Sequence, residues 1–284
     1  MHTLSQFYQG LSPEFGLPTF KKHVFPPPSE SVIAQYRCLM PHLLDAYPFT
    51  ELEKLYAEAS EGVEHLSWRL NGDEIEQLRS SLSSDGALLS IHDCLTAYLV
   101  VVLNCNKDVP IRTATNASSY RNVHAPFIDG DVAGNMLLNV VSDTLPVDMA
   151  GIATSIRTSI IRSRDVSYLE NWISTAGDLM LSSINSGKSF FFAPHEDVIT
   201  INSNAAIDWC SAHFGFPDGS RFHTAGLAKY YFRPFRSNPV KGADGIWHRR
   251  QGFVDISMGV PTELKPKILK TLADGLEPLL NLCV

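Results

Sequence analysis

The chain has 284 residues, of which 44% are hydrophobic and 19% are charged, an ordinary globular composition that argues against extensive disorder. Thirty acidic residues against 23 basic ones give a formal net charge of −7. This negative balance provides no electrostatic reason to bind nucleic acid, so we expect no nucleic-acid partner. The length allows one large domain or two medium ones.

The cysteines and the apolar segments indicate in which cellular compartment the protein is expected. Five cysteines are scattered, odd in number and never spaced as CxxC, which favours buried thiols in a reducing cytosol. They are Cys38, Cys94, Cys105, Cys210 and Cys283. The N-terminal "MHTLSQFYQGLSPEFG" does not have the basic start and apolar core of a signal peptide. The longest apolar run, "AYLVVVL", is too short to cross a bilayer. We therefore expect a soluble, cytoplasmic protein without a membrane partner.

The first third of the chain alternates loops and helices. Residues 1–30 read as a short amphipathic helix followed by an extended, proline-rich loop. Helical spacing follows over residues 31–47 and 50–62, broken at prolines. The segment "EHLSWRLNG", residues 64–72, alternates as a strand does, and Asp73 is placed to cap the helix that follows over residues 74–84.

The remaining chain mixes strand and helix patterns. Strands are expected within residues 109–117, 135–145, 189–194, 198–203, 228–235 and 246–260. Helices are expected within residues 147–164, 167–184 and 261–276. Strands and helices interleaved at these spacings predict an α/β layered fold with a mixed sheet flanked by helices.

The adjacent pair His92-Asp93 could be a catalytic base with its partner, or the first turn of a helix. Neighbouring residues on a helix point about 100° apart and do not face each other. Ser90 stands at the N-cap position and Asp93 follows three residues later, close to a capping box. We therefore interpret the pair as the start of an apolar, buried helix that runs past residue 100.

Other candidates for chemistry are weaker. His195, Glu196 and Asp197 stand together, but a metal site needs three or four converging ligands, so an exposed polar turn is favoured and no metal is expected. The triplet Gly187-Lys188-Ser189 does not have the upstream glycine of a phosphate-binding loop, and the order of strand and helix is reversed. Ser220 has no nucleophile-elbow context and fits a turn.

Five segments in a fixed order resemble a known family. They are "SIHDCLTAYL", "RTATNASSYRN", "DVAGNMLLNVV", "ITINSNAAIDWCSAHFGFPDGSRF" and "DGIWHRRQGFVDISMGVPTELKPKIL". Together, over roughly residues 60–280, they are similar to the C-terminal half of the BAHD or HxxxD-type acyltransferases, and most similar to the fungal branch that includes trichothecene 3-O-acetyltransferases. The resemblance implies a chloramphenicol-acetyltransferase-like lobe. It divides the chain into residues 1–60, a remnant of the first lobe with a crossover segment, and residues 61–284, the C-terminal lobe.

The resemblance also assigns roles to residues. Ser203 and Asn204 take the place of a pair that lines the acceptor side of the channel. Ser119 and Arg121 take the place of a basic loop that meets coenzyme A, and an arginine there suits a phosphate. Structural roles fall to Gly134 and Asn135, and to His213, Phe214 and Gly215, which occupy the position of the family's DFGWG segment although its aspartate is replaced by histidine.

The family's catalytic signature is not in this chain. None of the ten histidines is followed by aspartate four residues later. His42 has Asp45 three residues on, and His124 has Asp129 five residues on. The catalytic base is therefore not assigned.

In the family, two lobes enclose a channel that acyl-CoA enters from one side and an alcohol or amine from the other, with a histidine that accepts the proton. The resemblance thus implies acyl-CoA as co-substrate, no permanently bound cofactor, and a small-molecule acceptor. Three alternatives remain open. The chain acts in acyl transfer, with a first lobe supplied by another chain or with a substitute base. It is a non-catalytic relative that binds coenzyme A, another ligand or a partner. It is a truncated product. A lone lobe would expose an apolar face and self-associate.

Overall fold

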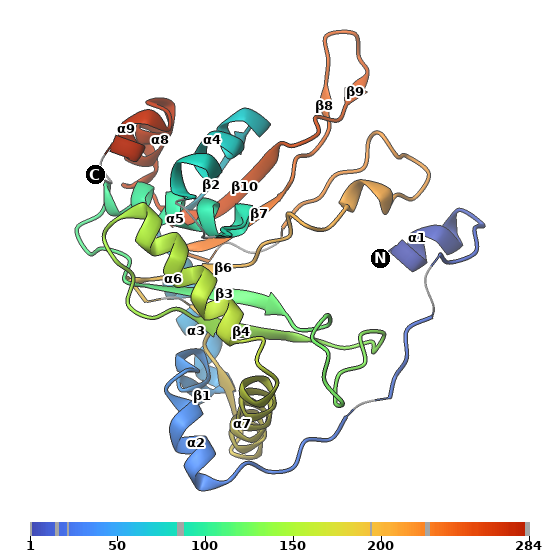
Figure 1. The fold of residues 1–284 in the computed structure, drawn as a ribbon, viewed down its shortest axis with the longest axis vertical. Coiled ribbons are helices and arrows are strands. Elements are labelled where there is room, and N and C mark those ends of the chain that lie inside the picture. The colour runs from blue at the N-terminus through green and yellow to red at the C-terminus, as the bar shows by residue number, and fades with distance from the viewer. Residues whose placement is uncertain are drawn as a thin grey trace.

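The computed structural model describes residues 2–14, 17–21, 23–83, 88–193, 195–224 and 228–281, and Cys283 lies outside them. Its centre is a six-stranded sheet in the order β2-β10-β7-β6-β3-β4 (Figure 1). The strands are β2 (Val63–Leu70), β3 (Thr113–Ser119), β4 (Leu137–Val141), β6 (Val198–Ile201), β7 (Tyr231–Arg236) and β10 (Val254–Pro261). β3, β6 and β7 run parallel, and the other pairs are antiparallel, so the predicted mixed sheet is confirmed.

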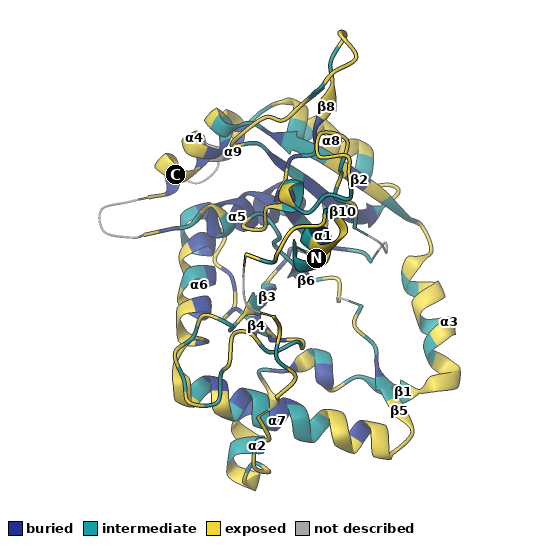
Figure 2. Ribbon diagram, turned by 90° about the vertical axis from the view of Figure 1, so that its right-hand side faces the viewer, coloured by how far each residue is buried: buried dark blue, intermediate teal, exposed yellow. Residues whose placement is uncertain are grey.

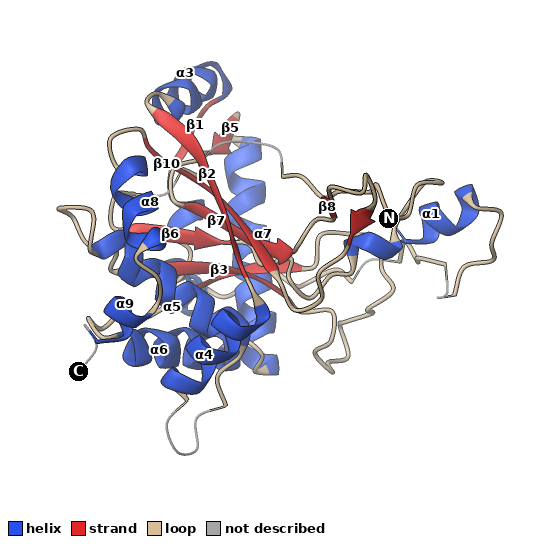
Figure 3. Ribbon diagram, turned by 90° about the horizontal axis from the view of Figure 1, so that it is seen from above, coloured by secondary structure: helices blue, strands red, loops and turns tan. Residues whose placement is uncertain are grey.

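Helices cover one face of this sheet (Figures 1 and 3). They are α4 (Gly72–Leu82), α5 (Ile91–Asn104), α6 (Met149–Arg162), α8 (Lys265–Ala273) and α9 (Glu277–Asn281). The strands present buried apolar side chains to them, among them Leu66, Ile199, Ile201, Phe232 and Met258. Burial of this apolar face supplies the main driving force for the fold.

Helix α5 lies at the centre of that layer. From Asp93 to Leu103 every residue is buried, as the apolar sequence predicts. Ser90 and Asp93 form the expected capping box, in which the Ser90 N–H donates to Asp93 Oδ2 at 2.7 Å. The side chain of Asp93 is fully buried and also accepts from Arg157 Nε of α6 at 2.7 Å. The cap therefore ties two helices together, and His92 does not bond to Asp93.

A second hydrophobic cluster lies beyond strand β4. Helix α2 (Glu30–Arg37) packs against α7 (Val166–Asn185), and strand β1 (Ala46–Pro48) pairs with β5 (Lys188–Phe190). The 3-10 helix η1 (Pro41–Leu43) and helix α3 (Phe49–Ser60) complete this part. Its buried side chains include Tyr36, Met40, Leu169, Trp172 and Phe190. Segments from both sides of residue 60 thus share one cluster, and the division at residues 60 and 61 stays a prediction.

The N-terminal helix α1 (His2–Tyr8) lies apart from the other helices, against the loop between β6 and β7 (Figure 1). That loop contains the 3-10 helix η2 (Trp209–Ser211), and the strands β8 (Val240–Lys241) and β9 (Trp247–His248) form a small hairpin. None of the helices in the described ranges is long and apolar enough to span a membrane.

Two local predictions were wrong. Asn71, not Asp73, caps α4: its side chain accepts from the Glu74 N–H at 2.9 Å, and Glu74 returns the bond to complete a capping box. Asn71 is the cap because it directly precedes the first helical residue, which is the N-cap position.

Of the four described cysteines only Cys94 is buried. Cys38 and Cys105 follow the last turns of helices at the surface and are exposed, and Cys210 is half-buried.

We expect Asp93→Asn to lower the free energy of unfolding by about 3 kcal/mol, because it leaves Arg157 facing a neutral group in a buried site. Urea unfolding measures the loss. The control is Asp143→Asn, which removes the partner of Arg162 from an exposed pair at 3.4 Å and is expected to cost about 0.5 kcal/mol. Equal losses in the two variants would contradict the assignment of Asp93 as the central tie.

Candidate functional site

The face of the sheet turned away from helices α4, α5 and α6 is polar. The strand register shows which alternate residues of each of the six strands lie on this face. Its polar members are His65, Ser67, Arg69, Thr113, Thr115, Ser119, Asn139, Thr200, Asn202, Tyr231, Arg233, Asp255 and Ser257. We call this surface the polar face. Figure 2 shows the contrast between the buried strands and helices of the core and the exposed outer segments. A sheet with one apolar and one polar face has its second face available for a ligand.

A cavity of about 200 Å³ lies between the polar face and the segments next to β1 and β5. We call it the β5 cavity. The sheet contributes Thr113, Thr115, Asn139, Val198, Thr200 and Tyr231, and the opposite wall consists of Pro41, His42, Asp45, Phe191, Phe192, Ala193 and His195. Hydroxyl groups thus face aromatic rings and two histidines across a small space.

His42 is the half-buried histidine of the β5 cavity. Its ring lies 6.3 Å from that of Trp172 in a stacked arrangement, and its Nδ1 is buried without a hydrogen-bond partner among the described residues. Burial lowers the pKa of His42 to about 4. The ring is therefore neutral at pH 7, available for hydrogen bonding but a weak base.

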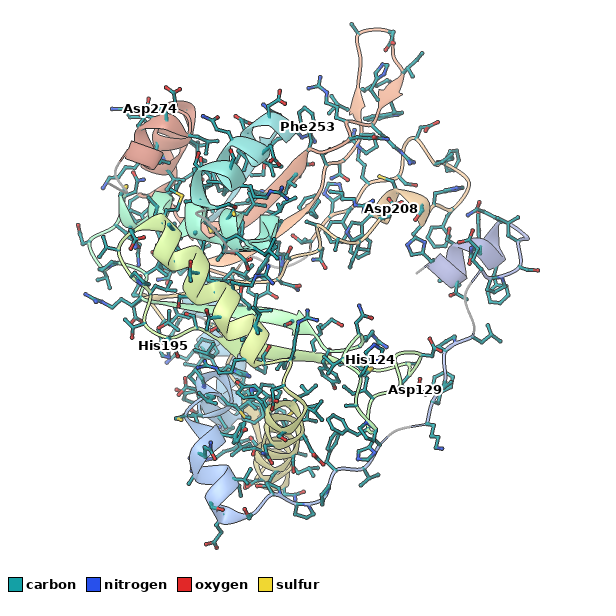
Figure 4. All side chains as sticks on the ribbon, viewed as in Figure 1. His124, Asp129, His195, Asp208, Phe253 and Asp274 are labelled. Atoms are coloured by element: carbon teal, nitrogen blue, oxygen red, sulfur yellow. The ribbon has the colours of Figure 1, made fainter. Side chains whose placement is uncertain are left out.

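His195 is the exposed histidine of the β5 cavity, and Figure 4 places it near the start of the central strands. Its Nε2 lies 3.6 Å from Asp45 Oδ2, and the two side chains are 70% and 40% exposed. The neighbouring Glu196 pairs instead with Lys229, which holds the pKa of the Glu196 carboxyl below its ordinary value. His195 thus stands on the expected polar turn, but with an acidic partner from a distant part of the chain.

A third histidine, His65, lies on the polar face in strand β2. Its Nε2 is 2.9 Å from Ser257 Oγ, and Thr224 Oγ1 lies 3.4 Å from the same hydroxyl. The nearest carboxylate in β10, Asp255, is held by Arg69 in two bonds of 2.5 and 2.8 Å. Asp255 also accepts from the Asn238 N–H, so this carboxylate is already engaged and does not bond to His65.

The residues predicted for the channel gather at the other end of the central strands. Ser203 and Asn204 follow the last residue of β6, and the Asn204 N–H donates to Pro234 O at 2.8 Å. Ser119 ends β3 and is exposed. Because β3 and β6 are parallel, their carboxyl ends lie at one edge of the sheet, and the structure brings these predicted residues to that edge.

Arg121 holds the loop that follows β3. Its Nη1 donates to Gly130 O and Val132 O, both at 2.8 Å, and its Nη2 donates to Gly134 O at 2.7 Å. The same loop contains His124 and Asp129, which Figure 4 shows at the opposite end of the sheet from His195. Gly134 and Asn135 are exposed just before β4. The guanidinium thus organises a loop of carbonyl groups, and its contact with coenzyme A stays a prediction.

The segment His213 to Gly215 lies in the loop after η2. The carbonyl of His213 accepts from Ser5 Oγ at 2.5 Å and from Gln9 Nε2 at 3.2 Å, and Phe214 meets Tyr8 edge-to-face at 5.4 Å. Gly215 adopts a φ of +96°, which favours glycine. This segment therefore docks helix α1, and the structural role that the resemblance implies for it stays a prediction.

Sequence reasoning missed the pair of Asp45 and His195. The two residues are 150 positions apart, and the pairing of β1 with β5 brings them together. His42 and Asp45, which are three positions apart and so do not form an HxxxD signature, lie in one wall of the same cavity. Among the described residues, no three side chains of the metal-ligating types converge in a way that could hold a metal ion.

No protein-family model matches the sequence, and no curated protein matches it in sequence. The fold does match solved structures. TRI101 of F. sporotrichioides, complexed with coenzyme A and T-2, matches with a TM-score of 0.57 and 13% identity over 94% of this chain and 59% of that one. TRI101 of F. graminearum, complexed with coenzyme A and T-2 mycotoxin, matches with a TM-score of 0.54 and 11% identity over 96% and 60% of the two chains.

Vinorine synthase matches with a TM-score of 0.50 and 14% identity over 74% of this chain and 48% of that one. This chain therefore shares its fold with part of vinorine synthase and of TRI101, both of which are BAHD acyltransferases. It spans about half of the length of these proteins, between 48% and 60%. TM-scores of 0.50–0.57 at identities of 11–14% show a shared fold, and the fold class expected from the sequence is confirmed.

The lowered pKa of His42 makes stability depend on pH. In the unfolded chain its pKa is about 6.5, against about 4 when folded, so protons favour the unfolded state and stability falls as pH drops below 6.5. Between pH 7 and pH 5 the loss from His42 is about 2 kcal/mol. We expect His42→Phe to remove that part of the loss in urea unfolding. The exposed His124→Asn serves as the control, and a pH dependence unchanged by His42→Phe would contradict the prediction.

Proposed function

We propose that this chain is an acyltransferase lobe that takes part in the transfer of an acyl group from acyl-CoA to a hydroxyl or amine of a small molecule. The observation that carries the proposal is the fold match to TRI101 over 94% of the chain. That TRI101 structure contains coenzyme A and T-2, a donor-side and a small-molecule ligand together. The polar face of this chain offers a sheet surface on which such ligands can lie.

In this proposal the polar face forms one wall of a channel. Ser203 and Asn204 contact the acceptor, while Ser119 and Arg121 contact coenzyme A. All four belong to the edge where β3 and β6 end, which supports a common site. The opposite wall comes from an HxxxD lobe on another polypeptide segment, from a second copy of the chain, or from the segments around β5. We also propose a cytoplasmic location and no permanently bound cofactor.

One observation favours a second candidate, a non-catalytic relative that binds coenzyme A or another ligand. The family's HxxxD signature is not among the 284 residues. A lobe of this kind would keep the binding surface and have no proton acceptor. Binding and turnover must therefore be measured separately.

The decisive experiment combines calorimetry of coenzyme A binding with an acetyl-CoA transfer assay on the purified chain, using a panel of small alcohols and amines. Released coenzyme A should be followed by chromatography, because the protein's own cysteines would react with a thiol reagent. Turnover supports the transferase, and binding without turnover supports the second candidate. If the chain shows no binding and no turnover, both candidates are refuted.

We expect Arg121→Ala to weaken coenzyme A binding at least tenfold, because it removes a cation and releases the carbonyl groups of Gly130, Val132 and Gly134. Arg164→Ala, in the exposed turn between α6 and α7, provides a matched loss of charge. Thermal unfolding checks that both variants are folded. An unchanged affinity in Arg121→Ala would place coenzyme A elsewhere.

A further inference from the structure

Another cavity, of about 390 Å³, lies where strand β7 begins, between the turn after α5, the loop before β2 and the end of β10. We call it the lysine cavity, because Lys107, Lys229 and Lys267 line it. It has no lining residue in common with the β5 cavity, and none of the residues proposed to contact the acceptor or coenzyme A belongs to it. A site in the lysine cavity would therefore be separate from the proposed channel.

Two of these lysines share one aromatic ring and one glutamate. The ammonium nitrogen of Lys107 lies 4.7 Å from the centre of the Tyr230 ring, and that of Lys229 lies 5.6 Å from the same point. Lys229 pairs with the carboxylate of Glu196, whereas Lys107 donates to the main-chain carbonyl of Glu196. The one carboxylate thus neutralises Lys229, and the hydrogen-bond acceptor of Lys107 in the described part of the chain is a neutral oxygen.

The Tyr230 ring is held in place beside the two ammonium groups. Tyr230 is 1% exposed, and its φ of +54° lies in the left-handed region that residues with a side chain rarely adopt. Its N–H donates to Gly259 O at 2.9 Å, and its carbonyl accepts from the Thr200 N–H at 3.0 Å. Strands β6 and β10 therefore fix this residue from both sides, so the ring stays where both lysines contact it. Strained backbone of this kind clusters at functional sites.

This arrangement favours the uncharged form of Lys107. Burial, which is the largest effect, and the ammonium group of Lys229 hold the pKa of Lys107 below its ordinary value, and the carboxylates of Glu196 and Asp197 offset them only in part. Burial also raises the pKa of the Tyr230 hydroxyl, so this ring adds no negative charge. The uncharged amine is the nucleophilic form of lysine, and a neighbouring cation or partial burial activates it. Lys107 is therefore more reactive than a lysine on the open surface.

We propose that Lys107, placed beside Lys229 on the Tyr230 ring, is a site of covalent acylation by acyl-CoA thioesters that enter the lysine cavity from solvent. The uncharged Nζ attacks the thioester carbon, a carbon–nitrogen bond forms, and the carbon–sulfur bond breaks. The proton released by the nitrogen goes to the leaving thiolate, so that an N-acyl-lysine and free coenzyme A result. The reaction goes beyond the proposed function and does not depend on it, because the lysine itself is the acceptor and the polar face takes no part.

The surroundings of Lys107 accommodate the product. An N-acyl-lysine keeps one N–H that can donate to Glu196 O, and Lys229 keeps the Glu196 carboxylate. Acylation removes one of two positive charges held over a single ring, so the repulsion between them and the cost of burying the ammonium group are both lost. Lys267, which lines the same cavity but is exposed, gains nothing comparable.

The first test is acetylation of the wild-type chain by acetyl-CoA at about pH 8, where ordinary lysines are almost all charged. Peptide mass spectrometry measures the rate at each lysine. We expect Lys107 to be acetylated about tenfold faster than Lys267 in the same cavity and than the exposed Lys54. Equal rates at Lys107 and Lys267 would overturn the proposal.

The same preference is expected with S-acetyl-N-acetylcysteamine, a thioester without the nucleotide of coenzyme A. This donor tests the reactivity of the amine, because it cannot be recruited through a nucleotide-binding surface. If Lys107 reacts with it no faster than Lys267 does, the environment of Lys107 is not the cause of its reactivity, and the proposal fails.

The second test is Lys229→Gln, which removes the neighbouring ammonium group and frees the Glu196 carboxylate for Lys107. Both effects raise the pKa of Lys107, so we expect its acetylation at about pH 8 to slow about threefold or more. Lys241→Gln removes the same charge from an exposed position in the β8–β9 hairpin and is expected to leave the rate unchanged. Circular dichroism checks that both variants are folded. An equal or faster rate at Lys107 in Lys229→Gln would contradict the proposal.

The outcomes also separate this acylation from the proposed function. If Lys107 is acetylated preferentially while no small alcohol or amine is acylated, the modification site stands and the transferase fails. If small acceptors are acylated and Lys107 reacts as Lys267 does, the transferase stands and the modification site is refuted.

Discussion

Burial of one face of the six-stranded sheet against helix α5 is the interaction on which the rest of the structure depends. The helix is enclosed from Asp93 to Leu103, so it must receive apolar side chains from the strands below it and from the helices on either side. Strand alternation then sends every second side chain to the opposite face. The polar face is thus a direct consequence of the apolar core, because each strand that feeds the core displays its polar half on the other side.

Both candidate regions follow from that geometry. The parallel run of β3 and β6 brings Ser119 and Ser203 to one edge, and the same strands bring Thr113 and Thr200 to the β5 cavity. Segments from the second hydrophobic cluster cover only the end of the polar face that contains the β5 cavity. One end of the polar face is therefore roofed by aromatic and histidine side chains, and the other is bordered by the loops of Arg121 and His213.

The ion pairs differ in burial and in the elements that they connect. The pairs Arg157–Asp93 and Arg69–Asp255 are the more buried ones, and both connect elements of the scaffold. The pair of His195 and Asp45 is exposed and longer, at 3.6 Å, and connects nothing that other bonds do not already hold.

The sequence by itself determined the α/β class, the buried helix with its Ser90 and Asp93 cap, and the position of most strands, because these depend on spacing along a short stretch of chain. Through the resemblance it also predicted the fold that the TRI101 structures share. Only the tertiary structure decided which face of the sheet is polar and open, that Asn71 caps α4, and that Arg121 holds a loop. It alone placed Asp45 beside His195, because the pairing of strands β1 and β5 brings together residues that are 150 positions apart, and no local pattern records a contact of that range.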